Sequence, residues 1–231
     1  SWYTIAAVNP RQGNKMMRST SFHRLLMCAL AFVANQATAV VPSAPKLPAD
    51  AYFLMDATTG QVLVNHNGDL SLPPASLTKI MTSYVLAEEV DAGRASLDDM
   101  IKVSRNAWSQ NPIFNGSSLM WIEPGKPVSL ADLERGVVIS SGNDASVAVA
   151  EHLAGTESSF VDMMNQLAAE LGLNNTVYRN PHGLPHPEHR TTARDLATLS
   201  VALINGHPEH YKIYKEQSFT YNGIKKYKRN S

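Results

Sequence analysis

Apolar and polar positions along the chain predict a β-hairpin followed by a helix. Two short apolar runs, residues 51–55 and 62–64, flank residues 56–60, which read DATTG and are rich in turn-forming types. This arrangement is typical of two strands joined by a tight turn. Downstream, the apolar side chains of residues 80–86 recur at helical spacing, and Gly93 provides a stop for that helix.

The middle of the chain predicts an irregular segment and then a run of helices. Residues 98–127 hold the pairs Asn-Pro, Asn-Gly and Pro-Gly, which are turn signals. Ser129 then forms a capping box with Asp132 and opens a helix. The predicted helices run over residues 129–139, 144–154, 157–171 and 192–206, with SSGN at 140–143 between the first two.

The end of the chain predicts one strand, residues 218–221, and then a basic turn, residues 222–231. Before that strand, His207 and His210 flank Pro208 and are expected to be solvated. Strands therefore lie at the two ends with helices between them. This order predicts an α+β fold in which a helical lobe is inserted into a sheet.

Composition separates the N-terminus from the rest. The chain has 231 residues, 44% apolar content and a formal net charge of zero, and its length suits one large domain or one and a half. Residues 1–39 hold four basic side chains and no acidic one, so the remainder carries 16 basic and 20 acidic groups. A net charge of −4 gives no reason to expect a nucleic-acid partner.

That basic head resembles an export signal. Arg18 and Arg24 precede a ten-residue apolar run, residues 25–34, and Ala-Thr-Ala at 37–39 fits a cleavage site. We expect residues 16–39 to be a cleaved signal peptide and residues 1–15 to be upstream sequence outside the fold. A membrane anchor is the alternative, but ten residues are about half of the ~20 that span a bilayer.

Metal sites and cofactors are not expected. The single cysteine, Cys28, lies within the predicted signal, so the mature chain has neither a disulfide nor a thiolate metal site. His182, His186 and His189 lie close together, but prolines between them prevent the helix that would align them as ligands.

Ser76 and Lys79 are the first candidates for chemistry. They lie three residues apart at a predicted helix start, so they share one face of a turn. A serine hydroxyl needs a base within hydrogen-bond reach, and burial lowers a lysine pKa enough to supply one. The backbone N–H of Ser76 is expected to serve as one oxyanion donor.

The Ser-x-x-Lys pattern is weak by itself, because residues 43–46 match it within a proline-rich stretch. Taken alone, the pattern favours the plainer interpretation, in which Ser76 is an N-cap beside a solvated lysine. Ser141-Gly142-Asn143 is the second element, and it interrupts two helices where glycine lets polar side chains converge. A hydroxyl there could relay a proton and an amide could hold a carbonyl, although a plain turn remains the alternative.

Longer stretches carry a resemblance to a known family. PASLTKIMTSYV, SSGNDASVAVAEHLAG, AYFLMDATTGQVL, GSSLMWIEPG and NPHGL with TTARDLA occur in order from about Leu47 to the end. Together they resemble the low-molecular-mass penicillin-binding proteins, specifically the serine-type D-alanyl-D-alanine carboxypeptidases. The resemblance implies a penicillin-recognising fold, an antiparallel sheet packed with helices plus a helical lobe, over residues 40–231.

The same resemblance implies residue roles. Ser76 would be acylated by the penultimate D-alanine carbonyl of a peptidoglycan stem peptide, with Lys79 as its activator. Ser141 would join these two as a catalytic residue. Asn143 and Leu184 would contact substrate, and β-lactams would be covalent inhibitors. The enzyme would be exported to the periplasm, with a membrane-surface contact only through a C-terminal helix that these residues do not include.

One expected motif is missing. The family's Lys-Thr-Gly, which normally supplies the second oxyanion donor and a cation, occurs nowhere in the chain. Ser231 therefore looks like a truncation point, with the C-terminal sheet strands absent. Because one oxyanion donor is worth about 10²–10³ in rate, we expect these 231 residues alone to be poorly active and unstable.

Two other functions remain open. A β-lactamase of the same fold would need a base for rapid deacylation, and Glu188 lies in the matching loop without the usual surrounding pattern. A non-catalytic wall-binding module is the second alternative, and it requires that the third motif is absent in nature.

Overall fold

The structure is a computed structural model, and it describes residues 46–228. The predicted signal peptide at 16–39, the segment 1–15 and the serine of the Ser43–Lys46 match lie outside the described residues. The helices are α2 (Thr78–Asp91), α3 (Leu130–Val138), α4 (Asn143–Ala154), α5 (Glu157–Glu170), α6 (Ala193–Gly206) and α7 (Pro208–Tyr211), with short 3₁₀ turns η1 (Ala75–Leu77), η2 (Pro112–Phe114) and η3 (Lys212–Lys215).

The predicted N-terminal hairpin is confirmed. Strand β1 (Tyr52–Met55) pairs antiparallel with β2 (Val62–His66), and Tyr52 lies opposite His66. Asp56 Oδ1 closes the turn by accepting hydrogen bonds from the backbone N–H groups of Thr58 and Thr59. An aspartate that bonds to its own turn is the usual reason for this residue type at the position.

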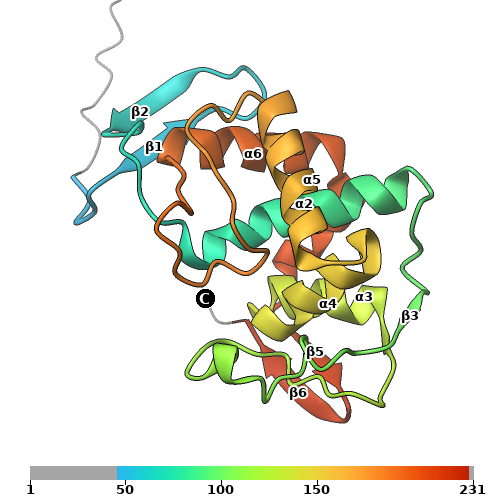
Figure 1. The fold of residues 1–231 in the computed structure, drawn as a ribbon. Helices are drawn as coiled ribbons and strands as arrows, with labels where there is room; N and C mark the ends of the chain where they lie inside the picture. The colour runs from blue at the N-terminus through green and yellow to red at the C-terminus, as the bar shows by residue number, and fades with distance from the viewer. Residues whose placement is uncertain (1–45, 229–231) are drawn as a thin grey trace, which may run out of the picture. The chain divides into compact units, whose positions relative to one another are not determined.

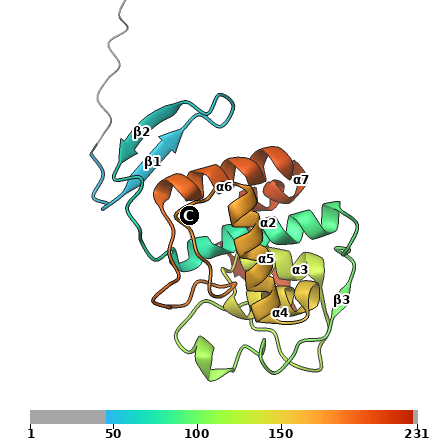
Figure 2. The ribbon, with the colours of Figure 1, turned by 45° about the horizontal axis from the view of Figure 1, so that its top comes forward.

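Helix α2 forms the centre of the helical lobe. Figures 1 and 2 show it between α6 on one side and α3 with α4 on the other, with α5 crossing over it. Met81, Val85 and Leu86 are almost completely buried, and so are the polar side chains of Thr78 and Thr82 on the same helix. A helix buried on all sides is a core element, and any polar group that it carries must find a partner inside the protein.

The capping signals place α3 to α6 close to their predicted bounds. Ser129 Oγ accepts from the Asp132 N–H at 3.1 Å, and Thr192 Oγ1 accepts from the Asp195 N–H at 3.1 Å. Gly155 ends α4 in a left-handed conformation, which a residue with a side chain adopts only at a cost. Helix α4 starts at Asn143, directly after the break at residues 140–142.

The predicted basic turn at residues 222–231 is wrong. Strand β5 (Ser218–Tyr221) is confirmed, but it pairs antiparallel with a second strand, β6 (Ile224–Tyr227). The turn is confined to Asn222 and Gly223, both with positive φ, which is the backbone of a two-residue hairpin. Lysines at positions 225 and 226 hid the strand, because lysine is depleted in strands overall and is used mainly on exposed edge strands.

The predicted solvation of His207 and His210 is also wrong. Both rings are buried, with exposed fractions of 6% and 7%. His210 Nδ1 lies 2.6 Å from Glu134 Oε1, and His207 Nδ1 lies 2.6 Å from Asp91 Oδ2. Carboxylates from α2 and α3 therefore provide hydrogen-bond partners for the rings of His207 and His210, which offsets the cost of burying them.

The strands of residues 46–228 form three separate two-stranded antiparallel sheets, including the short pair β3 (Met100–Ile101) and β4 (Val128–Ser129). The α+β class is confirmed, since antiparallel hairpins flank a helical lobe. Within this part of the chain the helices are too short and too polar for one of them to cross a bilayer.

Candidate active site

Ser76 lies in the 3₁₀ turn η1 at the entrance to α2. Its side chain is exposed and caps neither η1 nor α2, whose N-terminal flanking positions are Pro74 and Leu77. The capping alternative is therefore wrong. The preceding residue, Ala75, has φ +47°, a left-handed conformation that costs a residue with a side chain about 1 kcal/mol or more.

Lys79 places its amine among three oxygen atoms. Nζ lies 3.4 Å from Ser76 Oγ, 2.7 Å from Asn143 Oδ1 and 2.7 Å from the His182 carbonyl oxygen. Because the side chain is only 5% exposed, burial lowers the pKa of Lys79 from 10.5 to about 7, although the nearby Asp144 carboxylate opposes the shift. A substantial share of the amine is therefore neutral at pH 7.

A neutral amine has two N–H donors and one lone pair. The two closer oxygen atoms, Asn143 Oδ1 and the His182 carbonyl oxygen, can only accept hydrogen bonds, so they take both N–H groups. The lone pair is left for the third neighbour, the Ser76 hydroxyl. This arrangement directs the lone pair of Lys79 toward the Ser76 hydroxyl, which makes Lys79 a candidate base and Ser76 a candidate nucleophile.

The Ser-Gly-Asn segment meets this pair from the other side. Ser141 has φ +53° and lines the same cavity as Ser76 and Lys79. Asn143 is the first residue of α4, and its backbone N–H donates to the Ser118 carbonyl oxygen at 2.9 Å. With Oδ1 engaged by Lys79, the Nδ2 group of Asn143 is the part of the amide that can donate to a substrate carbonyl.

Asp144 is a site residue that the sequence reasoning missed. Its carboxylate accepts hydrogen bonds from the N–H groups of Met120, Trp121 and Ile122, and from its own neighbour Ala145. Burial raises its pKa, and this outweighs the opposite effect of the four donors. An acid in the first turn of a predicted helix was the signal that could have found it.

The loop between α5 and α6 closes the site from a third side. Thr82 Oγ1 donates to the Pro181 carbonyl oxygen at 2.6 Å, and Thr78 Oγ1 lies 2.8 Å from His189 Nε2. Gly183 has φ +88°, and a Cβ atom there would lie 1.8 Å from the Ala75 carbonyl oxygen. The loop approaches the nucleophile's turn so closely that only glycine fits.

Two of the three loop histidines are buried parts of this packing. Burial lowers the pKa of His182 to about 3 and that of His189 to about 4, so both rings are neutral at pH 7. His186 is exposed. Glu188, the residue considered above as a deacylation base, is exposed and pairs with Arg179 at 3.1 Å.

A cavity of about 420 Å³ opens beside the nucleophile. Its lining includes Ser76, Lys79 and Ser141, together with apolar side chains of α3 and the side chains of Tyr214 and Lys228. Leu184 is not part of that lining; it is half-buried against the core, and its contact with substrate stays a prediction.

The chain is similar to curated D-alanyl-D-alanine carboxypeptidases and to solved penicillin-binding proteins. The chain is 47% identical over 206 residues to D-alanyl-D-alanine carboxypeptidase DacC of Escherichia coli strain K12, covering 89% of this chain and 50% of that protein. Penicillin-binding protein 6B from Escherichia coli superposes with a TM-score of 0.79 at 46% identity, covering 83% of this chain and 61% of that one. Penicillin-binding protein D2 from Listeria monocytogenes, solved in its ampicillin-bound form, gives a TM-score of 0.69 at 28% identity over 82% of this chain and 75% of that one.

The chain spans about half the length of the curated relatives it matches. A family model described as D-alanyl-D-alanine carboxypeptidase matches residues 38–231, which include the whole of the chain that follows the predicted signal. On the strength of that match and of the identity to its curated relatives, the chain belongs to the D-alanyl-D-alanine carboxypeptidase family.

Proposed function

We propose that the protein containing this chain is a serine-type D-alanyl-D-alanine carboxypeptidase that removes the terminal D-alanine from peptidoglycan stem pentapeptides. The observation that carries the proposal is the arrangement at Lys79, whose two acceptors leave its lone pair to the Ser76 hydroxyl. A lowered pKa of about 7 makes that lone pair available at physiological pH.

In the proposed reaction, Lys79 Nζ takes the proton of the Ser76 hydroxyl while Oγ bonds to the carbonyl carbon of the penultimate D-alanine. Collapse of the tetrahedral intermediate breaks the carbon–nitrogen bond, and the D-alanine amine leaves with a proton passed from Lys79 through Ser141. Water then hydrolyses the ester and regenerates the serine. Asn143 Nδ2 is proposed to donate to a substrate carbonyl, and Leu184 is proposed as a further contact at the rim.

β-Lactams are the proposed covalent inhibitors, since a strained amide carbonyl would acylate the same Ser76. The structural neighbour from Listeria monocytogenes with ampicillin bound supports this extension. Export to the periplasm is proposed from the N-terminal basic and apolar pattern of residues 16–39. Any attachment to the membrane surface is proposed to depend on sequence other than residues 46–228.

The test uses the complete coding sequence that contains these residues. The purified protein is incubated with a fluorescent penicillin and, separately, with a stem pentapeptide ending in D-Ala-D-Ala. We expect covalent labelling that maps to Ser76 and release of one D-alanine per peptide. Ser76→Ala should abolish both, whereas Ser71→Ala, an exposed serine before the site, should change neither. Labelling at another residue would overturn the proposal.

A β-lactamase is the alternative within the same fold, and nitrocefin turnover separates the two. The pairing of Glu188 with Arg179 at the surface favours slow deacylation, because the glutamate is already engaged by an exposed arginine. Fast multiple turnover of nitrocefin would favour the lactamase. Absence of both labelling and D-alanine release would instead favour a non-catalytic wall-binding module.

A further inference from the structure

The direction of the Lys79 lone pair depends on the two oxygen atoms that accept its N–H groups. Asn143 Oδ1 and the His182 carbonyl oxygen take the two N–H groups of the neutral amine, each at 2.7 Å. Asn143 is held by helix α4, but His182 lies in an irregular loop. Something other than secondary structure must therefore hold the carbonyl of His182 in place.

Side chains of the loop brace this turn. Asn180 Oδ1 accepts from the Gly183 N–H at 2.6 Å, and Asn180 Nδ2 donates to the Leu184 carbonyl oxygen at 3.0 Å. The Leu184 N–H donates to His182 Nδ1 at 3.1 Å. The imidazole ring thus bonds to the backbone two residues beyond its own carbonyl and fixes the turn at that point.

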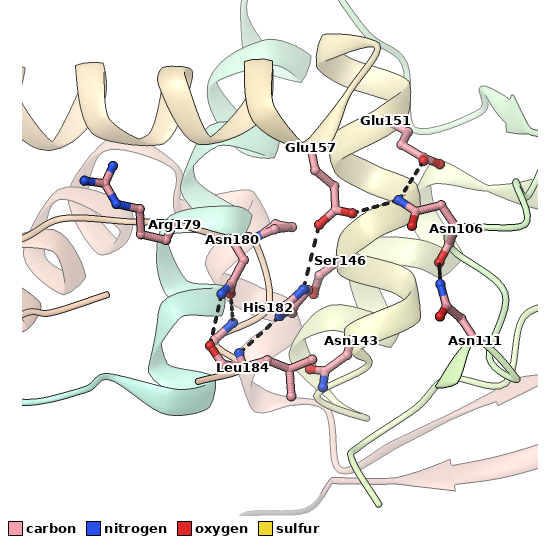
Figure 3. Close-up of polar contacts among 12 residues, drawn as sticks. Asn106, Asn111, Asn143, Ser146, Glu151, Glu157, Arg179, Asn180, His182 and Leu184 are labelled. Atoms are coloured by element: carbon pink, nitrogen blue, oxygen red, sulfur yellow. Dashed lines mark hydrogen bonds and ion pairs between the residues drawn. The ribbon is translucent and has the colours of Figure 1, made fainter. Parts of the chain in front are cut away.

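The other end of the ring faces a carboxylate outside the loop. Because Nδ1 of His182 accepts a hydrogen bond, the neutral ring carries its proton on Nε2. Nε2 lies 3.7 Å from Glu157 Oε2, which is longer than a hydrogen bond and makes this a contact between the N–H dipole and the carboxylate. Figure 3 shows His182 between Leu184 and Glu157, and the glutamate in turn beside Asn106. Asn106 Nδ2 donates to Glu157 on α5 at 2.7 Å and to Glu151 on α4 at 3.2 Å. Asn106 therefore links the glutamate that faces the ring to both helices.

We propose that His182 is a positioning residue for the Lys79 base: held between the Leu184 N–H and the Glu157 carboxylate, its ring fixes the carbonyl that directs the lone pair to Ser76. This inference rests on the proposed function, since it assigns a role within that reaction. The ring does not itself exchange protons with substrate. Its Nε2 is turned toward Glu157, and its depressed pKa keeps it neutral at pH 7.

The same loop contains a matched control. His186 Nδ1 accepts from the Glu188 N–H at 3.2 Å, which is the same bond between a ring and the residue two positions on. The side chain of His186 is exposed, whereas that of His182 is only 4% exposed. The carbonyl oxygen that accepts from Lys79 belongs to His182 and not to His186. His186→Asn therefore repeats the chemical change of His182→Asn without the proposed consequence.

The experiment compares His182→Asn, Glu157→Ala, the double variant and His186→Asn in the protein expressed from the complete coding sequence. Asparagine keeps an acceptor for the Leu184 N–H but is too short to reach Glu157. Stopped-flow acylation by a fluorescent penicillin separates the noncovalent Kd from the acylation rate constant. Measurement at pH 9, where the Lys79 amine is neutral, isolates its direction from its charge.

We expect each single variant to lower the acylation rate constant at pH 9 by about tenfold, as small misplacements of reacting groups do, with Kd changed less than about twofold. Because both variants cut the same link, the double variant should lose no more than either single one. His186→Asn should match the wild type. Unchanged rate constants, losses that multiply in the double variant, or a loss confined to Kd would each overturn the proposal.

A substrate-free measurement distinguishes this inference from the proposed function. The NMR signal of the ¹³C-labelled ε-carbon of Lys79 reports its titration directly. A displaced carbonyl stabilises the ammonium less, so the pKa of Lys79 should fall in His182→Asn and in Glu157→Ala and stay unchanged in His186→Asn. If penicillin does not acylate the wild type but these shifts occur, the proposed function fails and the positioning of Lys79 stands. Equal titration in all variants would refute the positioning.

Discussion

Replacing Lys79 by methionine measures what the buried amine contributes to stability. The pKa of Lys79 falls from 10.5 in the unfolded chain to about 7 in the folded protein, because burial disfavours the charged form. A shift of one pKa unit is worth about 1.4 kcal/mol. At pH 6 the amine is charged in both states, so the whole shift destabilises the fold by roughly 5 kcal/mol.

The sign of the pH dependence follows from proton binding. Between pH 7 and 10.5 the unfolded state binds more protons at Lys79 than the folded state does, so the wild type gains stability as the pH rises through this window. At pH 9 the destabilisation is reduced to roughly 2 kcal/mol. Methionine does not titrate. The stability of Lys79→Met relative to the wild type should therefore be greater at pH 6 than at pH 9 by roughly 3 kcal/mol.

The difference between the two pH values removes the terms that are hard to predict. Methionine leaves Asn143 Oδ1 and the His182 carbonyl oxygen without their donor, which costs about 1–3 kcal/mol for each group. That loss is the same at both pH values and cancels. Urea unfolding of the complete protein at pH 6 and pH 9 supplies the four free energies, and Lys102→Met, an exposed lysine, is the control.

Two results would refute this reasoning. A difference below about 1 kcal/mol between the two pH values would mean that Lys79 does not titrate near pH 7 in the folded protein. An equal difference in Lys102→Met would assign the effect to general charge instead. Either result would also remove the basis for Lys79 as a neutral base at physiological pH.

Three further predictions follow from the same contacts. Acylation by penicillin should rise with pH with a midpoint of about 7, since only the neutral Lys79 amine can accept a proton, and a flat profile from pH 5 to 9 would contradict this. Gly183→Ala should abolish labelling, because its Cβ atom would lie 1.8 Å from a carbonyl oxygen beside the nucleophile, whereas Gly172→Ala, at φ +73° with open space around it, should cost only about 1–2 kcal/mol of stability in thermal unfolding. Hydrogen bonding to Glu134 raises the pKa of His210, so this pair stabilises the fold at pH below 6.5 and loses its contribution as the pH rises through the raised pKa; His210→Gln should flatten that part of the melting-temperature profile, and an unchanged profile would refute the linkage.

Local sequence determined most helix bounds and the proximity of Ser76 to Lys79. Ser129 and Thr192 cap their helices as their residue types and spacing predicted, and three residues of separation place Ser76 and Lys79 on one turn. These features depend on neighbours within one helical turn. The missed strand β6 shows the limit, because its partner supplies the hydrogen bonds that its own lysine-rich residues do not indicate.

Only the tertiary structure decided the hydrogen-bond partners and the lowered pKa on which the proposed role of Lys79 depends. Its two acceptors, Asn143 and His182, lie 64 and 103 residues further along the chain. The pKa of Lys79 is lowered because helix α4 and the loop that holds His182 bury the amine. The burial of His207 and His210 was unpredictable for the same reason, since Asp91 and Glu134 lie on helices distant in sequence. Hydrogen-bond geometry and desolvation depend on which groups lie close together in the folded protein, and a local pattern of residue types does not predict contacts between distant segments.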